Sequence, residues 1–369
     1  MNQLTIAQLV PALNAGGVEH GTVEVARALV AQGHRSLVVS SGGRLVGSLT
    51  RDGSEHHKLD IATKSPLALL KVAPLRRWFL GQSVDIVHAR SRLPAWLGYL
   101  AWRSIPKARR PRFITTVHGL NSINRYSRIM TRGERVIAVS DAVRDYVLSA
   151  YPDTPADKIT VIHRGVDYQR FRFGFAPGKN WQDTWHRRFP VTRGRQLVTI
   201  VGRLSRLKGH AAFIELIERL SRSNKLVTGL IVGGVQTGRE AYAGEIRQLI
   251  AERNLQDRIV LVGQRTDVRE IMAMSSVVLS LSEKPEAFGR TVAEALALGT
   301  PVAGWDYGGV AEILQQIFPA GKVPVGDIEA LTSRVAQFLA SPPTVPNMTA
   351  YSSQVMVEKT LALYSSLAD

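Results

Sequence analysis

The chain of 369 residues contains no cysteine. Disulfide bonds and cysteine-ligated zinc sites are therefore excluded, and a reducing compartment is compatible with the composition. The chain also lacks any run of about 18 apolar residues, so we expect no transmembrane helix. The stretch MNQLTIAQLVPALNAGG has no basic leader and no small-residue cleavage site. We therefore expect no signal peptide and a cytoplasmic protein.

Acidic side chains are few relative to basic ones. The chain holds 47 Lys and Arg against 30 Asp and Glu, a formal net charge of +17. Residues 1–172 carry 25 basic and 12 acidic side chains, whereas residues 173–369 carry 22 and 18. Such a surface attracts polyanions or anionic lipid headgroups. Arginine-rich codon usage is the alternative explanation, and it implies no partner.

Short apolar runs alternate with helical patterns in both halves of the chain. We predict strands at residues 4–10, 36–41, 85–90, 112–119, 135–140, 158–167, 196–203, 225–234, 258–264, 276–283 and 301–305. This βαβ rhythm is typical of parallel sheets with helices on both faces, and the length indicates two domains. The fold class is therefore α/β, with two doubly wound domains.

The domain limits follow from where the rhythm stops and restarts. We predict an N-terminal domain at residues 1–172 and a second domain at residues 195–345. A linker at residues 173–194 separates them, because that stretch shows no periodic pattern. Residues 346–369 follow a Pro-rich segment and are predicted to form a C-terminal helix that packs back on the first domain.

Ligands of open parallel sheets bind beyond the carboxyl ends of the strands, so we searched the loops there. Gly16 and Gly17 follow the first strand and would let the backbone approach a ligand or adopt unusual dihedral angles. Their spacing is not G-x-G-x-x-G, so hydride chemistry has no support, and a simple turn remains the alternative. After the strand at 196–203, Arg203 and Lys208 suit a diphosphate, although a solvated basic loop would look the same.

The segment EAFGRTVAEALALG, residues 286–299, places polar groups at the start of a helix. Backbone donors there are predicted at Phe288, Gly289 and Arg290. A helix N-terminus suits an anion. Glu294 lies on an otherwise apolar helix, where a buried carboxylate is costly unless it is paired. Glu286 and Glu294 therefore indicate a ligand that carries both phosphates and sugar hydroxyls.

Taken in order, AGGVE, TVHG, AVSDAV, VIHRGVD, VGRLSRLKG and EAFGRTVAEALALGTPVAG resemble the retaining GT-B glycosyltransferases of glycosyltransferase family 4. The resemblance covers essentially the whole chain and is close to enzymes of the lipopolysaccharide-core type. It implies two Rossmann-like domains that face a cleft, with the acceptor bound by residues 1–172 and the nucleotide-sugar donor bound by residues 195–345. A uracil base is the most frequent in the donors of the family.

The resemblance also implies roles for single residues in donor binding and catalysis. Glu294 would bind the ribose hydroxyls of the nucleotide, and Glu286 would contact hydroxyls of the transferred sugar. Arg203 and Lys208 would stabilise the leaving diphosphate. His118 would lie near the hydroxymethyl group of the donor sugar and the departing oxygen.

Other residues are implied to complete the same site. Gly16 and Gly17 would form the loop where donor phosphate and acceptor approach each other, and Phe288, Gly289 and Arg290 would bind the donor. Further cleft lining is predicted at Ser140, Asp141, Arg164 and Gly165. Arg164 stands where relatives often have asparagine, and an extra positive charge there suits a phosphorylated acceptor.

The resemblance implies a front-face mechanism, in which the leaving diphosphate helps to accept the proton of the attacking hydroxyl. No metal site is expected, because the chain has no D-x-D pair and cationic side chains would replace the ion. No cofactor is expected besides the nucleotide sugar, which is a substrate.

Residues 71–112 contain ten basic residues with Trp78, Trp96, Tyr99 and Trp102 between them. This composition favours the inner membrane surface and an anionic glycolipid or oligosaccharide acceptor, such as lipopolysaccharide core. The alternative is that Trp96, Tyr99 and Leu100 pack a helix on the sheet. Two other functions remain: a nucleotide-sugar epimerase or hydrolase of the same fold, and a nucleic-acid binder. We expect no nucleic acid partner, because the aromatic residues fall at helical spacing.

Overall fold

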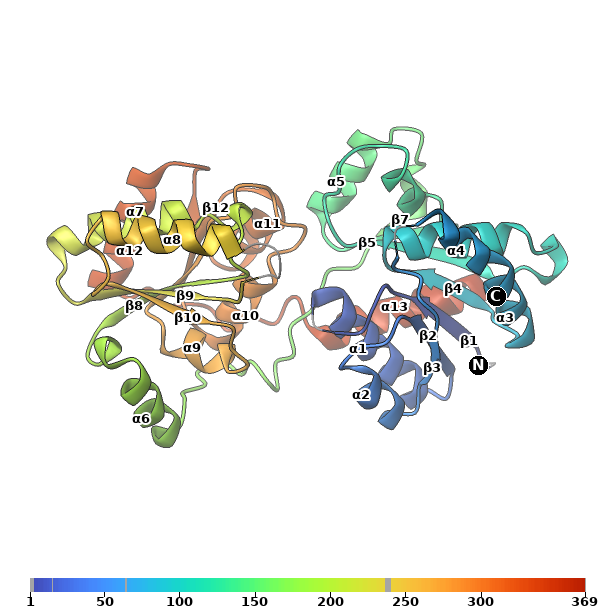
Figure 1. The fold of residues 1–369 in the computed structure, drawn as a ribbon, viewed down its shortest axis with the longest axis horizontal. Coiled ribbons are helices and arrows are strands. Elements are labelled where there is room, and N and C mark those ends of the chain that lie inside the picture. The colour runs from blue at the N-terminus through green and yellow to red at the C-terminus, as the bar shows by residue number, and fades with distance from the viewer. Residues whose placement is uncertain (1–2, 15, 64, 236–239, 369) are drawn as a thin grey trace. The chain divides into compact units, whose positions relative to one another are not determined.

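The computed structural model describes residues 3–14, 16–63, 65–235 and 240–368. The chain forms two compact units. Unit 1 comprises residues 1–165 together with 353–369, and unit 2 comprises residues 166–352. Each unit holds one parallel sheet with helices (Figure 1), which confirms the predicted α/β class with two doubly wound domains.

The sheet of unit 1 has the strand order β3-β2-β1-β4-β5-β6-β7, and every neighbouring pair is parallel. Its strands are β1 (Thr5–Leu9), β2 (Arg35–Ser40), β3 (Glu55–Lys58), β4 (Ile86–Ala89), β5 (Arg112–Val117), β6 (Arg135–Ala138) and β7 (Ile159–Val161). Its helices are α1 (Gly17–Ala31), α2 (Val46–Arg51), α3 (Val72–Gly81), α4 (Arg92–Arg103), α5 (Asp141–Ala150) and α13 (Ser353–Ala368). Short 3-10 helices lie at Pro66–Lys71, Lys107–Arg109, Ser127–Thr131 and Ala156–Lys158.

Helices cover both faces of this sheet. Successive residues of a strand point to opposite faces, so each strand contributes side chains to two cores. Ile86 and Ile114 belong to a core that includes α1 and α13. Phe113 points the other way, toward α4. A Cβ atom at Gly98 of α4 would lie 2.5 Å from Leu9, so glycine lets this helix pack closely on the sheet.

The last helix returns to the first unit. α13, red in Figure 1, contacts α1 and contributes Met356, Leu361 and Tyr364 to the core of unit 1. The Tyr364 hydroxyl lies 2.6 Å from Nδ1 of His88, and both side chains are buried. Residues more than 270 positions apart in sequence therefore share one hydrogen-bonded core.

The sheet of unit 2 has the order β10-β9-β8-β11-β12-β13, again all parallel. Its strands are β8 (Gln196–Val201), β9 (Val227–Val232), β10 (Ile259–Gly263), β11 (Val277–Ser280), β12 (Val302–Trp305) and β13 (Lys322–Val323). Its helices are α6 (Lys179–Arg188), α7 (His210–Ser223), α8 (Glu240–Glu252), α9 (Val268–Met274), α10 (Arg290–Leu298), α11 (Gly308–Ile317) and α12 (Ile328–Ala340). Short 3-10 helices lie at Pro190–Thr192, Arg206–Lys208 and Pro319–Gly321.

The predicted linker at residues 173–194 is wrong. The stretch contains α6, and Trp185 of that helix is only 2% exposed. Its ring lies 5.3 Å from that of Trp181 and 4.6 Å from that of Phe189, and it packs with strand residues of unit 2 such as Leu230. Burial of these large aromatic rings fixes the segment to unit 2 despite its polar composition. Along the chain, the boundaries between the units fall at residues 165/166 and 352/353, and not at the predicted residues 172 and 345.

Candidate active site

In each sheet the strand order reverses beside the first strand of the unit. The reversal lies between β1 and β4 in unit 1 and between β8 and β11 in unit 2. Ligands of doubly wound folds bind at such switch points, beyond the carboxyl ends of the strands. Most of the site residues predicted from the sequence follow strands next to these two points.

The switch point of unit 2 brings Lys208 and Glu286 together. The Nζ atom of Lys208 lies 2.6 Å from Oε1 of Glu286, which also accepts a hydrogen bond of 2.6 Å from the hydroxyl of Ser282. Burial raises the pKa of Glu286, but the ammonium of Lys208 and the Ser282 hydroxyl outweigh it and hold the pKa below its ordinary value. Glu286 is therefore ionised at neutral pH and suited to accept hydrogen bonds from hydroxyl groups. Ser282 was not predicted, although its position at the end of a buried strand was a signal.

An ammonium group carries three N–H donors. Lys208 can thus keep its bond to Glu286 and still donate to a phosphate oxygen. Arg203, in the same loop after β8, is exposed. The pair predicted to hold a diphosphate therefore has at least one further N–H donor on Lys208 and a solvent-exposed guanidinium on Arg203.

Glycines shape the loops around this pair. Gly209 has φ of 72°, and a Cβ atom there would lie 1.9 Å from the carbonyl oxygen of Leu281. A Cβ atom at Gly233 would lie 1.7 Å from the carbonyl oxygen of Gly202. The loops after β8, β9 and β11 consequently pack backbone against backbone, which only glycine permits.

Helix α10 begins beside Glu286, as predicted. Gly289 is its N-cap and has no side chain that could cap the first N–H groups of the helix, which suits that end to an anion. Phe288 is 5% exposed and packs edge-on against Tyr351, which anchors the turn.

Glu294 of α10 does not need a ligand to compensate its buried charge. Nε of Arg290 lies 2.8 Å from Oε1 of Glu294, whose side chain is 12% exposed. Glu294 therefore has an ion-pair partner within the chain, and its burial does not by itself require a ligand. Its role at the ribose stays a prediction that rests on the resemblance.

In unit 1, Gly16 and Gly17 begin α1. Gly16 is extended, with φ of 165°, and Gly17 is the first residue of the helix, so the expected unusual dihedral angles are absent. A Cβ atom at Gly17 would meet nothing within 4 Å. The Arg164 guanidinium donates to the carbonyl oxygen of Gly17. The loop thus shows no backbone strain, and its neighbours are Arg164 at Gly17 and Glu19, whose Oε2 a Cβ atom at Gly16 would approach to 2.4 Å.

His118 follows β5 and lines a pocket of unit 1. Its Nε2 atom is buried and has no hydrogen-bond partner among the described residues. Burial lowers the pKa of His118 well below its ordinary value, and the nearby Arg164 and Arg90 lower it further. The imidazole is therefore neutral at physiological pH and can form hydrogen bonds, but it cannot serve as a resident proton donor.

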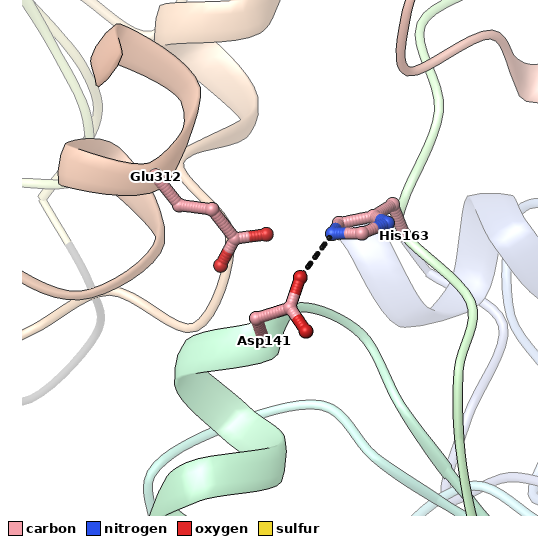
Figure 2. A group of neighbouring side chains, drawn as sticks. All are labelled: Asp141, His163 and Glu312. Atoms are coloured by element: carbon pink, nitrogen blue, oxygen red, sulfur yellow. Dashed lines mark ion pairs between the residues drawn. The ribbon is translucent and has the colours of Figure 1, made fainter. Parts of the chain in front are cut away.

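The residues predicted as further lining have structural contacts in unit 1. The Ser140 hydroxyl accepts a bond of 3.1 Å from the N–H of Val143 and so caps α5. Asp141 pairs with His163, whose Nε2 lies 3.3 Å from Oδ2 of the carboxylate (Figure 2). Asp141 also pairs with Arg144 at 2.5 Å. The polar side chains of Ser140 and Asp141 therefore have partners within the protein, and neither requires a ligand.

The aromatic residues of 71–112 pack within the unit. Trp96 donates to a backbone oxygen at 2.9 Å, and the ring of Trp102 lies 5.5 Å from that of Phe113. Three exposed apolar side chains lie just before this stretch, where Leu67 is 69%, Leu69 58% and Leu70 72% exposed. Among the residues described, no helix combines the length and apolar content needed to cross a bilayer.

The chain matches two family models along most of its length. The model described as Glycosyltransferase Family 4 matches residues 15–170, and that described as Glycosyl transferases group 1 matches residues 182–355. A glycosyltransferase of known structure from Rickettsia africae ESF-5 is 30% identical with a TM-score of 0.87, covering 100% of this chain and 99% of that one. The chain belongs to the GT-B glycosyltransferases of family 4.

Other relatives of this glycosyltransferase are more distant. The N-acetyl-alpha-D-glucosaminyl L-malate synthase of Bacillus anthracis is 23% identical over 89% of this chain and 85% of its own length. The lipopolysaccharide core biosynthesis mannosyltransferase LpcC of Rhizobium leguminosarum bv. viciae is 28% identical over 58% of this chain and 56% of its own. The structure of Anabaena HepE in complex with UDP and glucose is 20% identical, with a TM-score of 0.80, and covers 99% of this chain and 100% of that one. This last likeness shows the fold alone.

Proposed function

We propose that this glycosyltransferase moves a hexose or N-acetylhexosamine from a nucleotide sugar, a UDP sugar foremost, to an anionic glycolipid or oligosaccharide acceptor of the lipopolysaccharide-core type. The observation that carries the proposal is the Lys208–Glu286 pair at the switch point of unit 2, beside the start of α10. It joins a cation for phosphates to a carboxylate for sugar hydroxyls. The HepE complex with UDP and glucose supports the choice of donor, and the LpcC name supports the choice of acceptor.

The transfer is proposed to retain the configuration of the sugar and to need no metal. Lys208 and Arg203 stabilise the negative charge that grows on the leaving diphosphate, together with the N–H groups at the start of α10. Glu286 holds hydroxyls of the transferred sugar. Neutral His118 donates or accepts one hydrogen bond near the reacting carbon. The leaving phosphate oxygen accepts the proton of the attacking hydroxyl, so no side chain acts as base.

The proposal places the enzyme on the cytoplasmic face of the inner membrane. Its support is a leucine patch, defined as Leu67, Leu69 and Leu70, on the 3-10 helix that precedes α3. Lys71 follows it directly in sequence and pairs with Asp60 at 3.4 Å, and Arg76 and the exposed Arg77 lie on α3. Exposed leucines beside cationic side chains match the acyl boundary and anionic headgroups of such a membrane.

The donor site is tested by thermal shift with UDP, GDP, ADP and CMP on the wild type, Glu286→Gln and Glu294→Ala. We expect one nucleoside diphosphate, UDP, to raise the melting temperature of the wild type. Glu294→Ala should lose most of that shift, because the ribose loses its carboxylate, while Glu286→Gln should keep it. The control Glu252→Ala removes an exposed carboxylate of α8 and should behave as wild type. No shift with any nucleotide would contradict the proposed donor site.

The reaction type is tested with the UDP sugar that the enzyme binds. Release of UDP that requires an added acceptor supports transfer, whereas rapid release without acceptor would instead favour a hydrolase or epimerase. The anomeric configuration of the product, read by NMR, tests retention. Full activity in the presence of a chelator is expected, and its loss would contradict metal independence.

A further inference from the structure

Unit 1 has its own pocket at the switch point of its sheet. The pocket has a volume of about 330 Å³, within the range of small-molecule sites. Its walls come from the loops after β1, β4 and β5 and from the start of α1. The lining includes Glu19, Arg90, Ser91, Arg92, His118 and Asn121. Topology and shape therefore mark a ligand site in unit 1.

The decisive residue in this pocket is Arg90, directly after β4. Its side chain is only 4% exposed. One terminal nitrogen donates to Oε1 of Gln8 at 2.6 Å, but Nε is buried without a partner among the described residues. No described carboxylate forms an ion pair with it. Glu24 offsets part of this charge from beyond ion-pair distance, but the buried Nε donor stays without a partner among the described residues, which favours an anionic ligand.

The neighbouring groups extend the same site. Arg92 lines the pocket, where its Nη1 donates to the hydroxyl of Ser127 at 3.1 Å and its guanidinium lies 5.3 Å from the ring centre of Tyr126. His118 adds a second buried nitrogen without a partner among the described residues. The two guanidinium groups can hold one phosphate or carboxylate, and the imidazole stays available for a neutral part of a ligand.

Glu19 is the one carboxylate in the described lining. It cannot attract an anion, but its oxygens can accept hydrogen bonds from hydroxyl groups. A ligand that satisfies both sides of the pocket must therefore carry an anionic group and hydroxyls together. That combination describes an acidic sugar or a phosphorylated one, and it excludes a purely apolar ligand.

We propose that this pocket binds the anionic sugar of the acceptor, with Arg90 and Arg92 holding its phosphate or carboxylate and Glu19 holding a hydroxyl. The inference rests on the proposed function and adds to it the residues that select the acceptor. Arg90 thereby acts as a specificity-determining residue, distinct from the residues that hold the donor.

The test measures binding of glucose 6-phosphate, glucuronate and glucose to the full chain by calorimetry. We expect one or both of the acidic sugars to bind, with the stronger of the two identifying phosphate or carboxylate as the recognised group. Neutral glucose should bind at least ~10-fold more weakly, because Arg90 and Arg92 then lack an anion. Equal binding of all three sugars, or binding of none, would overturn the proposal.

Two variants locate the site. Arg90→Gln should weaken binding of the acidic sugar at least ~10-fold. Because the loss of a buried arginine can impair folding, Ser91→Asp provides a second variant: Ser91 is the N-cap of α4, where aspartate is well accepted, and the new carboxylate repels the anion. Arg51→Gln, which removes an exposed charge outside the pocket, is the control and should bind as wild type. Unchanged binding by Ser91→Asp would exclude this pocket.

UDP binding separates this inference from the proposed function. If Ser91→Asp loses the acidic sugar but still shows a thermal shift with UDP, both ideas stand. If the wild type binds UDP but no acidic sugar, the proposed acceptor pocket is contradicted and the proposed donor site is supported. If acidic sugars bind at Arg90 and no nucleotide binds anywhere, the proposed transfer fails and the anion site remains.

Discussion

At the scale of single residues, two ion pairs and one buried guanidinium define the candidate sites: Lys208–Glu286, Arg290–Glu294 and Arg90. Lys208 and Glu286 could be predicted as site residues because each follows a buried strand, and the structure brings them to 2.6 Å. The pairing of Arg290 with Glu294 was overlooked, although a spacing of four residues on a helix is itself a signal. Arg90 could not be singled out, because a pattern of letters does not distinguish a buried guanidinium from the nine other basic residues of 71–112.

His210 is a buried titratable group with a stability consequence. It begins α7, is 0% exposed, and its Nε2 has no partner among the described residues. Burial lowers its pKa to about 4, with the charge of Lys208 acting in the same direction and a backbone contact at Ser205 opposing. An unfolded histidine titrates near pH ~6.5. As pH falls from there to about 4, the unfolded chain binds a proton that the folded chain does not, so stability is lost in that window.

We therefore predict that acid destabilises unit 2 through His210. Between about pH 7.5 and about pH 4, the free energy of unfolding of the wild type should fall by up to ~3 kcal/mol more than that of His210→Gln. Urea unfolding followed by tryptophan fluorescence at each pH measures the difference. His186→Gln, a half-buried histidine of α6, is the control and should follow the wild type. Equal acid sensitivity of wild type and His210→Gln would show that this histidine is not responsible.

At the scale of elements, the strands were predictable wherever they are buried on both faces. β1, β8 and β9 read as apolar runs because helices cover them on each side. β3, with the sequence EHHK, could not be recognised, because an edge strand needs no apolar alternation and this one is polar throughout. α6 was missed for a related reason, since only Trp185 is fully buried on an otherwise polar helix.

Trp185 should account for much of the attachment of α6 to unit 2. We predict that Trp185→Ala lowers the free energy of unfolding by ~3–5 kcal/mol, because a large buried ring is replaced by a cavity. Denaturant unfolding of the full chain, followed by circular dichroism, measures the loss. Lys179→Ala on the exposed side of the same helix should change stability by less than ~0.5 kcal/mol. If Trp185→Ala is as stable as the control, Trp185 does not attach α6 to unit 2, and residues 173–194 act as a linker.

At the scale of the whole molecule, charge and exposed apolar area act together. A net charge of +17 draws the enzyme toward anionic surfaces but does not hold it there once salt screens the attraction. The leucine patch supplies a contribution that salt does not screen. Membrane association therefore has two separable parts, one tested by ionic strength and one by substitution.

We predict that the wild type co-sediments with phosphatidylglycerol-containing vesicles but not with pure phosphatidylcholine vesicles. The triple variant Leu67→Ser, Leu69→Ser, Leu70→Ser should reduce the bound fraction at least ~10-fold at low salt, because three apolar side chains no longer enter the acyl boundary. The matched control Leu226→Ser, Val325→Ser, Val355→Ser removes exposed apolar residues elsewhere and should bind as wild type. Equal loss in both triple variants, or no binding by the wild type, would contradict a membrane-docking role for the patch.

The return of α13 to the first unit has a consequence for biosynthesis. Unit 2 is continuous in sequence, so a ribosome releases all of it as one uninterrupted stretch. Unit 1 cannot complete its folding until residues 353–368 are synthesised. Met356, Leu361 and Tyr364 belong to its core, and Tyr364 is the hydrogen-bond partner of buried His88. The half of the chain that is translated first is thus the half that completes its folding last. Until then its exposed apolar surface is a binding site for a chaperone.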